Sequence, residues 1–208
     1  MRICAMRGID PSPGRTFESM NTTPAILAED RNALRAEARP LDADRDAFVE
    51  AMAAAPTAVT VVVHSDGEQV TGQTVSAFAS VTADPPTLLV CINQRSRLSS
   101  LLRPGELFSV NLLAPEQSAI ADSFAGRRGA ELEPYDTGRV DWVDRAGGVR
   151  TVSGAASSFE CSVEAHHLQG THGIVVARVL ASHRSAEASF GLSYCQRGYR
   201  ALTPAEFR

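Results

Sequence analysis

The chain has 208 residues, of which 44% are hydrophobic and 21% are charged, and its formal net charge is -4. This composition predicts a globular domain with a sizeable core, and the acidic balance lacks the basic footprint of a nucleic-acid-binding protein. No apolar run approaches the ~20 residues that span a bilayer, and the first residues lack the apolar stretch of a secretory signal, so we expect no membrane association and a cytoplasmic location.

Two regions are distinguished along the chain. Residues 1–40 are predicted to form an N-terminal extension, partly disordered or helical, because proline and glycine interrupt it and no period is sustained. The domain is expected over residues 41–208. It begins with a predicted helix that Asp42 is able to cap and that ends before Pro56.

Most of the domain has the pattern of short strands. They are expected at residues 57–64, 69–75, 87–92, 107–113, 158–165, 174–181 and 191–194. The first is nearly continuous in β-branched residues, which is typical of a strand buried on both faces, whereas 158–165 alternates and predicts a strand with one wet face. Two short helices are predicted, one after Ser96 and one from Pro115 to Gly126. No βαβ rhythm is present, which favours an antiparallel barrel with flanking helices.

The most informative stretch runs from Gly72 to Pro86 and is followed by an apolar run that ends in Asn93. Its small side chains would let a flat ring lie against the backbone, and its hydroxyls would hydrogen-bond a phosphate. All twenty basic residues are arginines, so there is neither a lysine Schiff base nor a P-loop lysine. Positive charge for a phosphate would have to come from arginine, and Arg95 or Arg97 is the candidate. The stretch therefore indicates a flavin-binding site.

The order of segments resembles the flavin reductase-like family over about residues 45–203. The matching segments are 48–52, 56–62, 72–86, 89–93, 108–113, 124–126, 170–172 and 199–202. The resemblance implies a mainly β, antiparallel Greek-key split β-barrel with flanking helices, assembled as a homodimer. It also implies that FMN or FAD is reduced by NADH or NADPH and that the reduced flavin passes to a separate flavin-dependent monooxygenase or halogenase.

The resemblance also assigns residues to the site. Thr74, Val75, Ser76 and Ala77 would line the isoalloxazine ring, and Ser80, Val81 and Thr82 would reach the phosphate, with Asn93 and Ser96 close by. His172 would lie near the nicotinamide as the catalytic residue, with Tyr199 at the same opening. The complete set of candidate cofactor-binding residues is Gln73, Thr74, Val75, Ser76, Ala77, Ser80, Val81, Thr82, Cys91, Asn93, Ser96, Arg97, Phe124 and Tyr199.

Simpler interpretations of these residues stay open. The hydroxyls of Ser76, Ser80 and Thr82 are also suited to turn hydrogen bonds, Phe124 to the core, and His172 to a structural role in a glycine turn. A metal site at His166-His167 is not expected, because neighbouring residues on a strand point to opposite faces. The alternative function is a non-catalytic split-barrel protein that carries or senses flavin or haem, and a third is a subunit with an interaction role alone.

Overall fold

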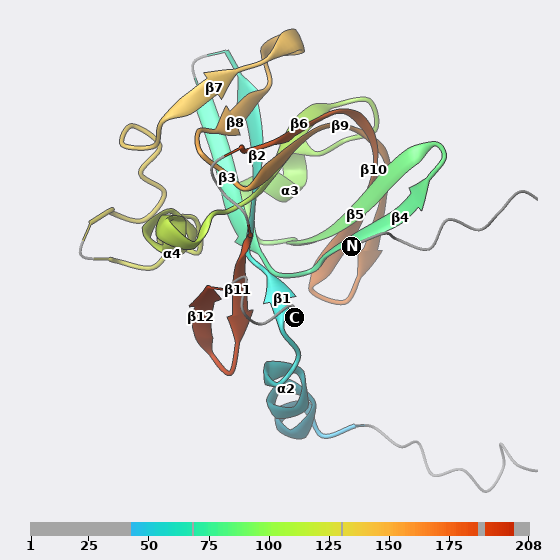
Figure 1. Cartoon of the computed structure of the whole chain (residues 1–208). Coiled ribbons are helices and arrows are strands. Elements are labelled where there is room, and N and C mark those ends of the chain that lie inside the picture. The colour runs from blue at the N-terminus through green and yellow to red at the C-terminus, as the bar shows by residue number, and fades with distance from the viewer. Residues whose placement is uncertain (1–42, 68, 130, 187–189, 202–208) are drawn as a thin grey trace, which may run out of the picture. The chain divides into compact units, whose positions relative to one another are not determined.

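A computed structural model of the chain describes residues 43–67, 69–129, 131–186 and 190–201 (Figure 1). The predicted extension, residues 1–40, lies outside these ranges. The helices are α2 (Arg45–Ala53), α3 (Arg97–Leu101) and α4 (Ser118–Phe124), with short 3-10 turns η1 (Pro115–Gln117) and η2 (Ala146–Gly148). The strands are β1 (Thr57–Ala58), β2 (Thr60–Asp66), β3 (Gln69–Val75), β4 (Phe78–Ala83), β5 (Pro86–Asn93), β6 (Leu107–Leu112), β7 (Trp142–Asp144), β8 (Arg150–Val152), β9 (Ser157–Gln169), β10 (His172–Arg184), β11 (Leu192–Cys195) and β12 (Gly198–Ala201).

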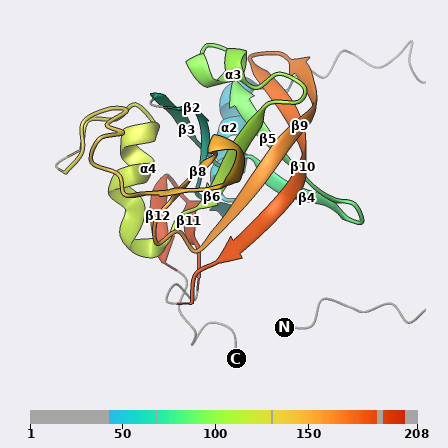
Figure 2. The same cartoon turned by 90° about the horizontal axis from the view of Figure 1, so that it is seen from above.

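Seven strands form one antiparallel sheet in the order β3-β2-β6-β9-β10-β5-β4. The long β9–β10 hairpin runs beside β5, as Figure 2 shows. Strands β1, β11 and β12 make a second sheet, and β7 pairs with β8. The predicted antiparallel, mainly β fold with flanking helices is confirmed, while the sequence pattern did not reveal β4, the β7–β8 pair or β12.

The two cores of the domain lie on opposite faces of β2. Val62 packs in a cluster with Ile92, Phe108 and other residues inside the curled sheet, where Leu98 and Leu102 of the α3 region join them. Val61 and Val63 pack with Phe124 in a cluster on the outer face. The continuous apolar run of this strand was therefore correctly interpreted as buried on both faces.

Helix α4 covers part of the outer face of β3 and fixes one wall of the site. Pro115 opens the turn η1 before the helix, and Gly126 follows its end with a φ of 72°, in the left-handed region that glycine favours. The Thr74 hydroxyl on β3 donates to the Ala121 carbonyl at 2.7 Å. Since this bond takes the only hydroxyl proton of Thr74, its side chain is able to offer a ligand only an acceptor.

One expectation about an exposed face needs correction. The polar side of β9 was expected to be wet, but Ser158 and Glu160 are 4% and 9% exposed. Contacts between β8 and β9 cover this end of the strand, and the Ser158 hydroxyl donates to buried Asn111. Conversely, α2 is present as predicted but none of its residues is buried. Within the described ranges, no helix has the length and apolar character needed to cross a membrane.

Candidate functional site

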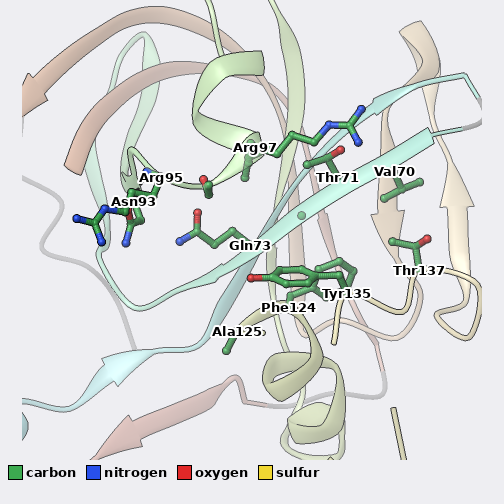
Figure 3. A pocket seen from close by; sticks show the side chains of 13 residues that line it. Val70, Thr71, Gln73, Asn93, Arg95, Arg97, Phe124, Ala125, Tyr135 and Thr137 are labelled. Carbon is green, nitrogen blue, oxygen red and sulfur yellow. Dashed lines mark hydrogen bonds between the residues drawn. The ribbon is translucent and has the colours of Figure 1, made fainter. Parts of the chain in front are cut away.

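A cavity of about 670 Å³ lies between β3, the segment from Asn93 into α3, and the end of α4. Its lining residues are Val70, Thr71, Gly72, Gln73, Asn93, Arg95, Ser96, Arg97, Leu98, Phe124, Ala125, Tyr135 and Thr137. In Figure 3, Asn93 and Arg95 lie at one end and Val70 and Thr137 at the other, with the rings of Phe124 and Tyr135 along one side. Its size is typical of small-molecule and cofactor sites.

Three side chains at the first end have hydrogen-bond donors that no group among the described residues accepts. Asn93 Oδ1 accepts the Arg95 backbone N–H at 2.9 Å, and Ser96 Oγ accepts the Ser99 N–H at 3.3 Å. The acceptor atoms are thus occupied, while the Asn93 amide and the Ser96 hydroxyl keep their protons for a ligand. Across residues 43–67, 69–129, 131–186 and 190–201, no group pairs with the Arg95 guanidinium. The cluster of Asn93, Arg95 and Ser96, called here the donor cluster, is suited to a phosphate.

Two other predicted residues lie in the same cavity with different surroundings. The Arg97 guanidinium donates to the side chain of Gln69 at 3.0 Å and points away from the donor cluster (Figure 3). Gln73 projects from β3 between the two ends of the cavity, and its buried Oε1 has no partner among the described residues. Arg95 and Arg97 were both predicted as candidates to bind a phosphate. Of the two, Arg95 is the one whose guanidinium belongs to the donor cluster and has no partner among the described residues.

A second cavity, of about 160 Å³, adjoins the first at Ala125. It is lined by Val59, Thr74, Val75, Ser76, Ala125, Arg127, Tyr194 and Tyr199. The Tyr199 hydroxyl donates to Asp122 Oδ1 at 2.7 Å, and burial, followed by this hydrogen bond, raises the pKa of Tyr199 above its usual range. Tyr199 is therefore a neutral phenol at physiological pH and lines the cavity beside Thr74 and Ser76.

The predicted ring and phosphate segments are separated in the structure. Thr74, Val75 and Ser76 lie at the second cavity, and Ala77 follows them in the connection to β4, where its carbonyl accepts the Cys91 N–H at 3.0 Å. Ser80, Val81 and Thr82 lie on exposed β4 and line neither cavity. The Thr82 hydroxyl forms hydrogen bonds with the carbonyl and N–H of Asp84, which is the turn role that the sequence left open.

His172 lies beside the donor cluster. It is the first residue of β10, and its Cα pairs in register with that of Asn93 on β5, which puts both side chains on one face of the sheet. The Gln94 amide donates to the carbonyls of Gly170 and His172 at 3.0 and 3.1 Å, so the turn is tied to the segment that carries the cluster. Thr171 Oγ1 lies 2.9 Å from His172 Nδ1. Tyr199 lines the second cavity, whereas His172 lines neither of the two cavities, so their sharing of one opening stays a prediction.

The adjacent Gly173 packs against a histidine ring on β9. His166 Nδ1 donates to the Leu102 carbonyl at 3.1 Å, and its buried Nε2 has no partner among the described residues. A Cβ at position 173 would overlap Nε2 and lie 2.7 Å from Cδ2 of that ring. His167 is exposed, so the two histidines face opposite sides of the sheet as expected.

We predict that Gly173→Ala lowers the free energy of unfolding by about 1–3 kcal/mol, the usual cost of overpacking a core. Urea unfolding followed by circular dichroism measures this loss. The double variant Gly173→Ala, His166→Ala is expected to recover part of it, because the smaller side chain makes room for the added methyl group. Equal stability of Gly173→Ala and the original chain would contradict the packing described here.

Several lining residues had no signal in the sequence. Tyr135 and Thr137 follow α4 in a polar stretch, and neither they nor Arg127 and Tyr194 were singled out from the sequence. The segment before Tyr135 is held by a bond between separate elements, in which the Ser123 hydroxyl donates to the Glu133 carbonyl at 2.6 Å. No local pattern could have connected these residues to the cavities, because the contacts join separate elements.

The residues present fit a flavin nucleotide. The donor cluster supplies neutral and charged donors for a phosphate, and Thr74, Val75 and Ser76 at the end of β3 line the second cavity with short side chains. Phe124 is fully buried in the outer core and also lines the first cavity, so its expected structural role is confirmed. Its contact with a flavin stays a prediction.

Comparisons with known proteins agree with this chemistry. A family model described as flavin reductase like domain matches residues 52–203. The chain is 34% identical over 159 residues to the FMN reductase (NADH) RutF of Serratia proteamaculans, covering 76% of this chain and 89% of that protein. It is 35% identical over 160 residues to the reductase component of 4-hydroxyphenylacetate 3-monooxygenase from Thermus thermophilus, covering 76% and 97%.

The fold is likewise found among solved structures. The NADH:FAD oxidoreductase SgcE6 of Streptomyces globisporus, solved in complex with NAD and FAD fragments, superposes with a TM-score of 0.66 at 28% identity. The match covers 77% of this chain and 94% of that protein.

Proposed function

This chain belongs to the flavin reductase-like family, and from that premise we propose that it is an NAD(P)H-dependent flavin reductase. It takes a hydride from NADH or NADPH, reduces FMN or FAD, and supplies the reduced flavin to a separate monooxygenase or halogenase. The observation that carries the proposal is the donor cluster of Asn93, Arg95 and Ser96 at the end of a cofactor-sized cavity. The comparisons name the activity, and this cluster supplies a phosphate site for it.

The chain's residues divide the work of binding. A bound flavin supplies the acceptor for the hydride. Asn93, Arg95 and Ser96 hold its phosphate, while the backbone at Thr74 to Ala77 lies along its ring. No nucleophile or strong base is required for hydride transfer, and Tyr199 as a neutral phenol is neither. We propose that His172 orients the hydride donor, which its register with Asn93 supports.

Purified protein with NADH or NADPH and added FMN or FAD tests the proposal. We expect the absorbance of the nicotinamide cofactor to fall far faster than in the flavin-free control. No turnover with any of the four cofactor pairs would overturn it. A tightly retained flavin that NADH does not bleach would instead favour the carrier or sensor alternative.

His172→Ala distinguishes catalysis from binding within the same assay. Because the side chain of His172 is exposed, its replacement is expected to slow hydride transfer and leave flavin affinity largely unchanged. Stopped-flow reduction of bound flavin measures the first quantity, and fluorescence titration with flavin measures the second. An unchanged rate of reduction would remove His172 from the reaction.

We also propose that the protein acts as a homodimer in the cytoplasm. Exposed large apolar side chains support an interface, and three of them, Phe48, Val49 and Met52, lie on α2. Single exposed apolar residues are ordinary, but a helix with an unburied apolar face is not. Sedimentation equilibrium tests the assembly, and a monomer at all concentrations would overturn it.

A further inference from the structure

Tyr135 has an unusual backbone conformation at the edge of the first cavity. Its φ is 58°, in the left-handed region that costs a residue with a Cβ conformational free energy. The only other described non-glycine residues with positive φ are Gln196 and Arg197, which form the tight turn between β11 and β12. Tyr135 lies in no hairpin, so its conformation needs another explanation.

The end of α4 holds Tyr135 in this conformation. The Tyr135 N–H donates to the Ser123 carbonyl at 3.0 Å, and the Asp136 N–H donates to the Ser123 hydroxyl at 3.1 Å. Gly126 leaves room for the ring, because a Cβ there would lie 2.7 Å from the Tyr135 hydroxyl oxygen. The backbone is thus fixed on both sides of a tyrosine that is 58% exposed and lines the cavity.

Tyr135 lies with Phe124 along one side of the first cavity, between the donor cluster and the end at Val70 and Thr137 (Figure 3). Along β3 the cavities follow the order of the chain, with Thr74 at the second cavity and Gln73 and Val70 at the first. If a flavin ring lies at Thr74–Ala77 and its phosphate at the donor cluster, the space beside Val70, Thr137 and Tyr135 is left for another group (Figure 3). That space borders an aromatic ring and the Arg97 side chain.

We infer that this end of the cavity binds an adenosine phosphate and that the Tyr135 ring stacks on its adenine. Aromatic side chains stack on purines through their faces, and arginine pairs with the accompanying phosphates. The inference rests on the proposed function, since the adenine would come either from FAD or from the nicotinamide dinucleotide. Tyr135 is then a specificity-determining residue, because FMN has no adenine for it to contact.

Isothermal titration calorimetry with FMN, FAD and ADP-ribose tests the inference on the original chain, Tyr135→Ala and Tyr135→Phe. Tyr135→Ala is expected to weaken either FAD or ADP-ribose about tenfold, as for the loss of one base–aromatic stack. FMN affinity should stay unchanged, and Tyr135→Phe, which keeps the ring, should match the original chain with all three ligands. Loss confined to FAD assigns the adenine to the flavin, and loss confined to ADP-ribose assigns it to the hydride donor.

The inference is overturned if Tyr135→Ala binds all three ligands like the original chain, if it weakens FMN as much as FAD, or if neither adenosine ligand binds the original chain. Circular dichroism of each variant shows whether the fold is kept. These outcomes are distinguishable from failure of the proposed function. If the original chain reduces flavin with NADH and Tyr135→Ala binds all three ligands with unchanged affinity, the proposed function stands and the adenine site is overturned. A chain without flavin reduction loses the function, whatever the titrations give.

Discussion

Replacement of Asn111 by alanine is expected to lower the free energy of unfolding by about 3–5 kcal/mol, a large share of the ~5–15 kcal/mol of a typical domain. Asn111 is fully buried. Its amide donates to the Val61 carbonyl at 3.1 Å and to Ser109 Oγ at 2.9 Å, and its Oδ1 accepts from the Val152 N–H at 2.9 Å and the Ser158 hydroxyl at 3.0 Å. Its loss leaves the last two donors buried without their acceptor.

Ser158→Ala is the matched control for Asn111→Ala. It removes one bond of the same network while Asn111 Oδ1 keeps the Val152 N–H, so a loss of about 0.5–1.5 kcal/mol is expected. Urea unfolding measures both variants under the same conditions. If Asn111→Ala cost no more than Ser158→Ala, the network would not be joining β2, β6, β8 and β9 as the hydrogen bonds indicate.

This network explains where prediction of the fold from sequence succeeded and failed. Successive side chains of a strand point to opposite faces, so the unbroken apolar run at Val61–Val63 puts apolar side chains on both. Burial on both faces could therefore be predicted from the sequence alone. Ser158 and Glu160 have the alternation of a wet face, yet they are buried because β8, the strand that precedes β9, packs against this end of it. The alternation of polar and apolar residues shows which side chains of a strand are polar, but not whether they are buried. Burial of a polar side chain depends on a hydrogen-bond partner that the local sequence does not reveal.

The same distinction applies to the site. Residues that lie on one continuous segment, such as Asn93 and Ser96, were predicted together and are brought together by the turn into α3. The roles of the hydroxyl groups could not be predicted, because the sequence does not show which acceptor each hydroxyl will donate to. The Thr74 hydroxyl donates to α4, and the Thr82 hydroxyl donates within its own turn. Tyr135 enters the cavity only through Ser123, a contact between separate segments of the chain.

Arg95→Gln is expected to weaken FMN binding about 10–100-fold, because one charge-assisted hydrogen bond contributes about 1.5–3 kcal/mol. The Arg95 guanidinium has no partner in the part of the chain that the structure describes, so the substitution breaks no ion pair there and should leave the free energy of unfolding almost unchanged. Fluorescence titration measures the affinity. Arg103→Gln is a matched control, since it removes the same charge from an exposed turn that lines neither cavity.

Riboflavin separates phosphate recognition from every other effect of Arg95→Gln. It has the same ring as FMN but no phosphate, so the original chain and the variant are expected to bind it equally. Added salt should weaken FMN binding to the original chain more than to the variant. Dissolved ions screen the attraction between exposed charges, with a Debye length of about 10 Å at 0.1 M ionic strength. Equal losses for FMN and riboflavin would place Arg95 against the ring or its support, and the donor cluster would then no longer be the phosphate site.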